Sequence, residues 1–330
     1  MNKQIYFIIG ASNKLGTGHF FRSVNLAKKL KNSGNKVNLI VRSKKEFQDY
    51  HKIYLSVFNK IINFKEINSL KIFQQSSLSI LIVDDPRIDF NLQKLLYKYF
   101  GRLILYQDLP KKNFCDVLVN HNIIKNSLKI YRLLSQKKTK LLLGEKYFLL
   151  NSDYPIIKSI KIKKNINITI FFGGLSNNIY LTKILEILTV IKNKKKIIKV
   201  NCVLGKYAKD YNTYKKKFKN IKFHKNLTQL AFYKLLANTT MYIGSGGSSL
   251  FESLKFNIKC GIFCTAKNQL NNCKNLSQKK IIYYFRNHKK KYLAKKIDKM
   301  INNPSKNTAE YSTIKNFSIN IGKNQVLNYI

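Results

Sequence analysis

The stretch IYFIIGASNKLGTGHFFRSVNLAKKLKNSGNKVNLIVR, residues 5–42, predicts a strand, a glycine-bearing loop, a helix and a second strand. Its first apolar run, residues 5–10, is too short for a helix and fits a buried strand. Apolar residues then recur every three positions from Phe21 to Leu30, and Gly34 lies where a helix C-cap belongs. A strand, a helix and a strand in this order indicate a parallel sheet.

The same alternation runs along the rest of the chain. Strands are predicted at residues 36–42, 79–85, 102–108, 115–120 and 140–144, and then at 166–174, 199–205, 241–247 and 259–264. Helices are predicted near residues 90–99, 179–193, 225–239, 249–257, 290–301 and 308–317. A basic, weakly patterned segment that contains Pro155 separates the two series. The sequence therefore predicts an α/β protein of two Rossmann-like parallel-sheet domains, residues 1–155 and 156–330.

The net charge of +47 is extreme for a chain of 330 residues. A strongly basic chain suggests a nucleic acid, an anionic membrane surface or an anionic substrate as partner. The lysines, however, are scattered over the whole sequence, and no basic run is interleaved with aromatic residues as in a nucleic-acid module. We interpret most of the charge as compositional drift and expect no nucleic-acid partner, whereas phosphate-bearing ligands and a peripheral membrane association remain compatible with it.

The five cysteines and the apolar runs indicate a cytoplasmic protein. The cysteine count is odd and the spacings match no zinc pattern, so free thiols in a reducing compartment are expected. The N-terminal apolar run fits a strand better than a signal peptide, and no apolar stretch approaches 18 residues.

The first glycine loop, with Gly16 and Gly18, leads into a helix whose first turn carries His19. Ligands of open α/β sheets bind beyond the carboxyl ends of the strands, and helix N-termini bind anions. His19 could act there as a general base, because the positive helix end favours the neutral imidazole. The alternative is a polar capping residue without chemistry.

Two further glycine loops follow predicted strands of the second domain. The first contains Gly173, Gly174 and Ser176, and the second runs from Gly244 to Ser249, with Gly247, Ser248 and Ser249 at a helix start. Backbone amides and hydroxyls in such loops suit a diphosphate. Glu252 either accepts hydrogen bonds from ribose hydroxyls or completes a capping box with Ser249. Asp84, Asp85 and Asp89, at a strand end, suggest ligand contact or helix capping rather than a metal site.

Several of these segments resemble the UDP-sugar hydrolases of the pseudaminic acid pathway. LGTGHFFRSVNLAKKL (15–30) resembles the opening of that family, FFGGLSNN (171–178) its second-domain loop, IGSGGSSLFESL (243–254) its nucleotide-binding segment, and AKNQ (266–269) its Asn-Gln element. The stretches ILIVDD (80–85), LYQDLPKKNFCDVLVNHN (105–122) and LLGEKYFLLNSDY (142–154) also match in order, so that the resemblance covers nearly the whole chain.

The resemblance implies a GT-B fold, in which two Rossmann-like domains face each other across a cleft. It implies that His19 activates a water that displaces UDP from a diacetamido-trideoxy sugar, with no cofactor and no metal. Glu252 would hold the ribose, Asn268 would contact the sugar, and the amides near Gly174 and from Gly247 to Ser249 would hold the diphosphate. Arg22, Asp84 and Gln269 complete the predicted substrate-binding set.

Some positions depart from the family pattern. Ile8 and Gly10 stand where the family has Arg-x-Asp, and Asp85-Pro86-Arg87 follows Asp84 where it has His-Tyr-Gly. Gln325 stands where an arginine is expected between Gly322 and Val326. These differences leave the identity of the sugar open, and they leave a second hypothesis open, a GT-B glycosyltransferase of surface-polysaccharide synthesis.

Overall fold

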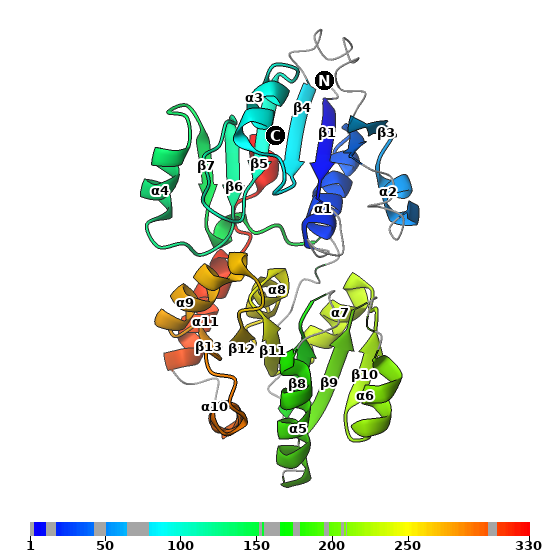
Figure 1. The fold of residues 1–330 in the computed structure, drawn as a ribbon, viewed down its shortest axis with the longest axis vertical. Coiled ribbons are helices and arrows are strands. Elements are labelled where there is room, and N and C mark those ends of the chain that lie inside the picture. The colour runs from blue at the N-terminus through cyan, green and yellow to red at the C-terminus, as the bar shows by residue number, and fades with distance from the viewer. Residues whose placement is uncertain are drawn as a thin grey trace. The chain divides into compact units, whose positions relative to one another are not determined.

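The computed structural model describes residues 3–10, 18–42, 51–64, 79–151, 154, 166–173, 179–194, 198–205, 208, 210–302 and 309–330 (Figure 1). The chain forms two compact units. The first comprises Met1–Ser152 together with Gly322–Ile330, and the second comprises Asp153–Ile321.

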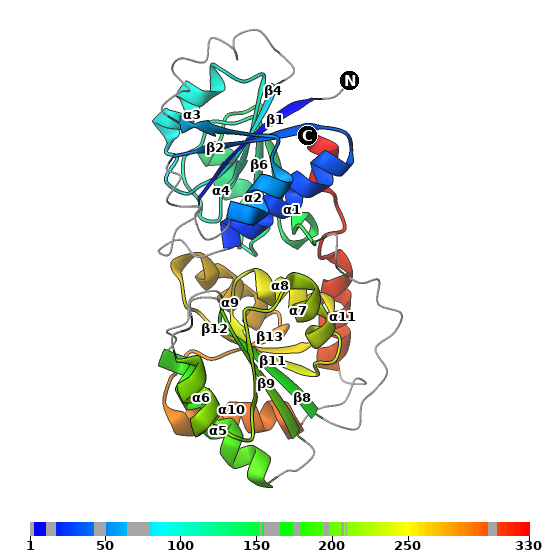
Figure 2. The same cartoon turned by 90° about the vertical axis from the view of Figure 1, so that its right-hand side faces the viewer.

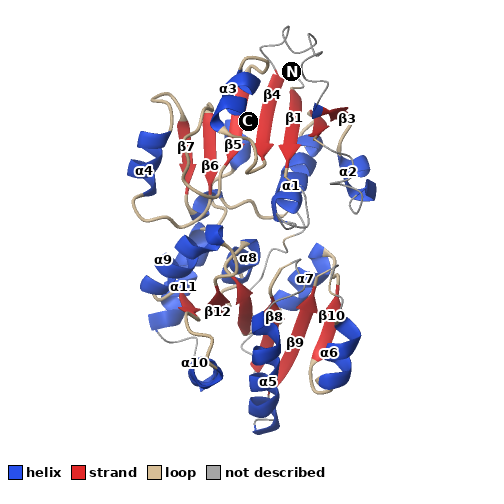
Figure 3. Ribbon diagram, viewed as in Figure 1, coloured by secondary structure: helices blue, strands red, loops and turns tan. Residues whose placement is uncertain are grey.

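The first unit is built on a parallel sheet with the strand order β3-β2-β1-β4-β5-β6-β7 (Figure 3). The strands are β1 (Gln4–Ile9), β2 (Lys36–Val41), β3 (Lys60–Asn63), β4 (Ser79–Asp84), β5 (Arg102–Tyr106), β6 (Val117–Asn120) and β7 (Lys140–Leu143). The order reverses between β1 and β4, where Ile9 pairs with Asp84. The carboxyl ends of these two strands therefore form the switch point at which such folds bind ligands.

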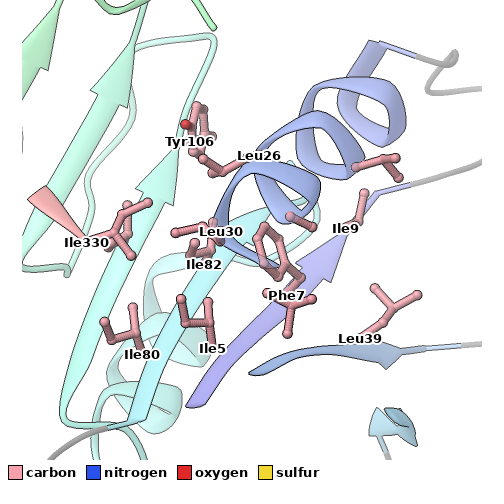
Figure 4. Packing of buried hydrophobic residues seen from close by; sticks show 14 of the residues in the cluster. Ile5, Phe7, Ile9, Leu26, Leu30, Leu39, Ile80, Ile82, Tyr106 and Ile330 are labelled. Carbon is pink, nitrogen blue, oxygen red and sulfur yellow. The ribbon is translucent and has the colours of Figure 1, made fainter. Parts of the chain in front are cut away.

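Helices cover both faces of this sheet. They are α1 (Gly18–Asn32), α2 (His51–Val57), α3 (Phe90–Tyr97) and α4 (Ser127–Leu134). The unit also contains two short 3-10 helices, η4 (Glu145–Tyr147) and η6 (Val326–Tyr329). Alternate residues of β1 face opposite sides of the sheet, because side chains alternate along a strand. Ile5 and Phe7 pack with residues of α1 and α2, and Figure 4 shows Phe7 facing the helix α1. Tyr6 and Ile8 pack with residues of α3 and α4 on the other face.

The end of the chain belongs to the first unit. Val326 and Ile330 are buried in the same core cluster as Ile5, and the amide of Gly322 donates a hydrogen bond to the carbonyl oxygen of Glu145. Figure 4 shows Ile330 beside Ile80 and Ile82 of the sheet. The sequence prediction placed residues 322–330 in the second domain, and the structure corrects it because these apolar side chains complete the first core.

The second unit repeats the architecture with the strand order β10-β9-β8-β11-β12-β13, again with parallel pairing. The strands are β8 (Ile166–Phe171), β9 (Ile198–Leu204), β10 (Lys222–Lys225), β11 (Met241–Ser245), β12 (Lys259–Phe263) and β13 (Ile282–Tyr284). The helices are α5 (Ile179–Lys194), α6 (Tyr211–Lys217), α7 (Gln229–Leu236), α8 (Ser248–Lys255), α9 (Leu270–Gln278), α10 (Lys290–Asn302) and α11 (Ala309–Asn320), with the 3-10 helix η5 (Lys267–Gln269).

Helices again lie on both faces of this sheet. Figure 2 shows α5 and α10 on one face and α7, α8 and α11 on the other. Residues of α5 and α10 share a core cluster with Ile168 and Ile170 of β8. The predicted fold class, an α/β protein of two Rossmann-like parallel-sheet units, is confirmed. In the described part of the chain, each helix is too short or too polar to cross a lipid bilayer.

Candidate active site

A polar cluster lies at the carboxyl ends of the central strands of the first sheet. His19 and Arg22 come from the first turns of α1, and Asp84 is the last residue of β4. Asp108 lies two residues beyond β5, and His121 directly follows β6. Because parallel strands end at the same edge of a sheet, five residues from four separate segments of the chain meet at the switch point.

His19 is bound to Asp84. Its Nδ1 lies 2.7 Å from Asp84 Oδ1, and its Nε2 lies 3.8 Å from Asp108 Oδ2. Burial by itself lowers the pKa of His19, but the charge of Asp84 and the hydrogen bond to it outweigh burial, so the pKa is raised above its usual value. The net shift therefore runs opposite to the one expected at a positive helix end, because the Asp84 carboxylate stabilises the imidazolium. A histidine that donates Nδ1–H to a buried carboxylate presents Nε2 as a strengthened base.

Arg22 joins the two carboxylates. Its Nε donates to Asp84 Oδ2 at 2.8 Å, its Nη2 to Asp84 Oδ1 at 2.6 Å, and its Nη1 to Asp108 Oδ1 at 3.0 Å. The Ser23 hydroxyl donates a further hydrogen bond to Asp84 Oδ2. Burial would raise the pKa of Asp84, but Arg22 and His19 hold it below its usual range. Arg22 and Asp84, predicted as substrate contacts, are thus bonded to each other, with exposed side-chain fractions of 9% and 1%.

The sequence prediction missed Asp108 and His121. Burial alone would raise the pKa of Asp108, but Arg22 above all, with the two histidines, holds it well below its usual range. Burial and the charge of Arg22 lower the pKa of His121 to about 4, so this imidazole is neutral at pH 7. Their positions in the sequence could have identified them, because Asp108 and His121 follow buried strands whose carboxyl ends lie at the same edge of the sheet as Asp84.

The neighbouring carboxylates have structural partners. Asp89 is the N-cap of α3 and accepts a hydrogen bond from the amide of Leu92 at 2.9 Å, as the capping hypothesis predicts. Asp85 forms a salt bridge with Arg87. Within the described residues, His, Cys, Asp and Glu side chains form no group of three that could hold a metal ion. Gly18 begins α1, whereas Gly16 lies outside the described residues.

In the second unit, the loop between β11 and α8 makes close contacts that explain its glycines. A Cβ on Gly244 would collide with the carbonyl oxygen of Phe171 and with the Tyr242 hydroxyl. A Cβ on Gly246 would lie 2.8 Å from Cys273 Sγ. Gly247 is the N-cap of α8, which begins at Ser248. The contact of Gly244 with Phe171 reflects the close pairing of β11 with β8 at the switch point of the second sheet.

Gln269 links this loop, through hydrogen bonds, to the residues that follow β12. Its Oε1 accepts hydrogen bonds from the amides of Gly246 and Thr265 and from the Thr265 hydroxyl, at 3.2, 3.0 and 3.0 Å. Three donors on one oxygen fix the orientation of the Gln269 amide. Its Nε2 then lies 3.7 Å from the position that a Cβ on Gly247 would take. Asn268 is half-buried in the same 3-10 helix.

Glu252 lies in α8 and bonds to α7. Its Oε1 accepts hydrogen bonds from Gln229 Nε2 at 2.8 Å and from the Tyr233 hydroxyl at 2.9 Å. Burial raises the pKa of Glu252 to about 7, and these hydrogen bonds oppose the rise. The capping-box alternative is excluded, because Gly247 is the N-cap and Ser249 lies inside the helix.

Ser249 is 8% exposed, and its Oγ is 2.9 Å from the Tyr242 hydroxyl. Gly173 adopts a left-handed backbone with φ of +93° just after β8. Gly174 and Ser176, also predicted to bind substrate, lie outside the described residues.

Comparisons of the sequence with known proteins find a distant relative and no matching family. No family model matches the chain. An uncharacterised protein of Methanocaldococcus jannaschii is 28% identical over 266 residues, which cover 76% of this chain. The match covers 53% of that protein, so this chain spans about half the length of the relative.

Solved structures match over both units. The structure of Acinetobacter baumannii MurG has a TM-score of 0.62 at 11% identity and matches 98% of this chain and 96% of its own. A UDP-N-acetylglucosamine 2-epimerase also has a TM-score of 0.62, at 8% identity, over 98% and 92% of the two chains. A glycosyltransferase from Rickettsia africae has a TM-score of 0.59 at 14% identity, over 99% and 95%. The fold is therefore that of the GT-B glycosyltransferases and related enzymes.

Proposed function

We propose that the protein acts on a nucleotide-activated sugar and that His19 is the base that deprotonates the attacking oxygen. The observation that carries this proposal is the hydrogen bond between His19 and Asp84 at the switch point of the first sheet. Asp84 fixes the ring orientation and stabilises the imidazolium that forms when a proton is taken up. The names of two structural neighbours, an N-acetylglucosamine epimerase acting on a UDP-sugar and a glycosyltransferase, agree with this class of substrate.

The proposed reaction is a displacement at the anomeric carbon. The oxygen of the nucleophile forms a bond to that carbon while its proton moves to His19 Nε2. The bond between the anomeric carbon and the phosphate oxygen breaks, and its electron pair leaves with UDP. A diphosphate is a good leaving group once its charge is stabilised, so backbone amides can supply much of the catalysis.

The second unit would bind the nucleotide. Glu252 presents a half-buried carboxylate, which can accept hydrogen bonds from ribose hydroxyls. The glycine loop leads directly into α8, with Gly247 as the N-cap and Ser248 as the first helical residue. Unpaired amides at such a helix N-terminus favour an anion. Gly173, Gly174, Ser176, Ser249, Asn268 and Gln269 are the remaining proposed contacts.

Two versions of the reaction differ in the nucleophile. The structural neighbours favour glycosyl transfer to an acceptor alcohol, and we propose surface-polysaccharide synthesis as its setting. The sequence motifs favour hydrolysis of a UDP-linked diacetamido-trideoxy sugar, a step towards nonulosonic acids. Both use the same base and the same leaving group, so both predict that UDP is released.

Release of UDP from a panel of UDP-sugars, with and without acceptor alcohols, tests the proposal. The panel includes UDP-N-acetylglucosamine and a UDP-2,4-diacetamido-2,4,6-trideoxyhexose. We expect His19→Ala to lower kcat by about 10²–10⁴-fold, as for the loss of a general base, while UDP affinity is retained. Full turnover in this variant would refute the role of His19, and absence of UDP release from every donor and acceptor would refute the proposed class.

A further inference from the structure

The exposed edge of the buried cluster is formed by His19 and Asp108. Their side chains are 13% and 17% exposed, whereas those of Arg22 and Asp84 are 9% and 1% exposed. The atoms that face each other at this edge are His19 Nε2 and Asp108 Oδ2, 3.8 Å apart. A small ligand that reaches the base from this edge therefore meets the carboxylate as well.

Each of these two atoms is oriented by a hydrogen bond to the other polar atom of its own side chain. Asp84 binds Nδ1 of the His19 ring, which directs Nε2 away from Asp84. Arg22 binds Oδ1 of Asp108, which directs Oδ2 towards the histidine. The backbone at Asp108 is also fixed, because its carbonyl oxygen accepts a hydrogen bond from Asn122 Nδ2 at 3.3 Å. The pair of acceptor atoms is therefore preorganised.

The spacing of the pair fits one water molecule. An oxygen placed about 2.8 Å from both atoms subtends an angle of about 85° between them, close enough to the angle between the two O–H bonds of water for two bent hydrogen bonds. An alcohol carries only one hydrogen on its oxygen. If it donates that hydrogen to His19, either a lone pair or its carbon substituent faces the ionised carboxylate, where a hydrogen-bond donor is needed.

We propose that Asp108 is a second catalytic residue, which accepts the other hydrogen of the attacking water and so selects water over alcohols. This inference rests on the proposed function and makes the enzyme a hydrolase. The water oxygen bonds to the anomeric carbon, one hydrogen moves to His19 Nε2, and the other stays on the new sugar hydroxyl, bonded to Asp108. The glycosidic electron pair leaves with UDP, and His19 then returns its proton to solvent.

The test is the partition of product between water and methanol. Wild-type protein and the variant Asp108→Asn are incubated with the best UDP-sugar of the panel at one fixed methanol concentration, and NMR measures free sugar against methyl glycoside. In the variant, Arg22 keeps its acceptor oxygen and the amide nitrogen replaces Oδ2, so a donor faces the nucleophile. We expect the ratio of free sugar to methyl glycoside to fall about tenfold, as for the loss of one hydrogen bond to a charged group.

A control and a second readout separate this role from a structural one. Asp298→Asn removes a carboxylate from α10, far along the chain, and should leave the ratio unchanged. Asp108 raises the pKa of His19, so its removal should move the acidic limb of kcat and the NMR titration of His19 to lower pH. Thermal melting and UDP affinity show that the variant is folded.

The outcomes distinguish the inference from the proposed function. An unchanged partition ratio in folded Asp108→Asn would overturn the inference, because Asp108 would then have no part in the choice of nucleophile. A wild-type protein that prefers methanol would also overturn it and would favour a transferase. If wild-type protein released UDP from none of the donors, the proposed function would fail, and the inference with it.

Discussion

The substitution Asp84→Asn removes the carboxylate on which the first site depends. Asp84 is 1% exposed and accepts hydrogen bonds from His19, Ser23 and two nitrogens of Arg22. Removing one partner of a buried ion pair costs about 3–5 kcal/mol, because the other charge remains buried. Asp108 still pairs with Arg22, so we expect the lower end of this range, about 3 kcal/mol, in the first unit.

Differential scanning calorimetry and urea unfolding would measure this loss. For a unit of this size, about 3 kcal/mol corresponds to a fall in Tm of about 6–12 °C. The pKa of Asp84 is lowered in the folded protein, so its stabilisation is present at pH 7 and is lost as the pH falls below its usual value. The difference in Tm between wild type and variant should therefore shrink towards pH 3. A loss under about 1 kcal/mol at pH 7, or a difference that grows in acid, would refute the ion-pair network.

Two further predictions concern the second unit. Glu252→Gln should weaken UDP binding in calorimetric titrations yet stabilise the unit by about 1–3 kcal/mol at pH 8. The raised pKa of Glu252 means that stability is lost as the pH rises from the usual pKa of a glutamate to about 7, and the loss is complete at pH 8; lower stability with unchanged UDP affinity would contradict this. Gly244→Ala should destabilise the unit by about 2–3 kcal/mol, because the added Cβ meets the Phe171 carbonyl oxygen; an unchanged melting temperature would show that β8 and β11 are not so closely apposed.

The sequence predicted the inner strands well because burial leaves a continuous apolar run. All six residues of β4 are buried, and five of the six residues of β1 are buried. The strands that it missed, β3, β10 and β13, lie at sheet edges, contain three or four residues, and are only partly buried. Such short, half-exposed segments carry too few alternating positions to be distinguished from loops.

The candidate site was predicted in part. His19 was identified from the glycine loop at the start of its helix and Asp84 from its place at a strand end, but the pattern could not show that Asp84 binds His19. Asp108 and His121 follow strands in the same way, yet no local motif marks them, and their role depends on the strand order β1-β4-β5-β6. The return of Val326 and Ile330 to the first core is likewise a tertiary effect, since the segment has no periodicity of its own.

The carboxylates of the two candidate sites differ in their partners. Asp84 and Asp108 share the charge of Arg22, which keeps both ionised against the effect of burial. Glu252 is bonded to the neutral donors Gln229 and Tyr233, which only partly offset burial, so its pKa rises to about 7. A ligand that donates hydroxyl hydrogens to Glu252 would stabilise its ionised form and lower this pKa. UDP binding should therefore release protons near pH 7, and calorimetry in buffers of different ionisation enthalpy would detect the release. Binding without proton release would mean that Glu252 does not contact the nucleotide.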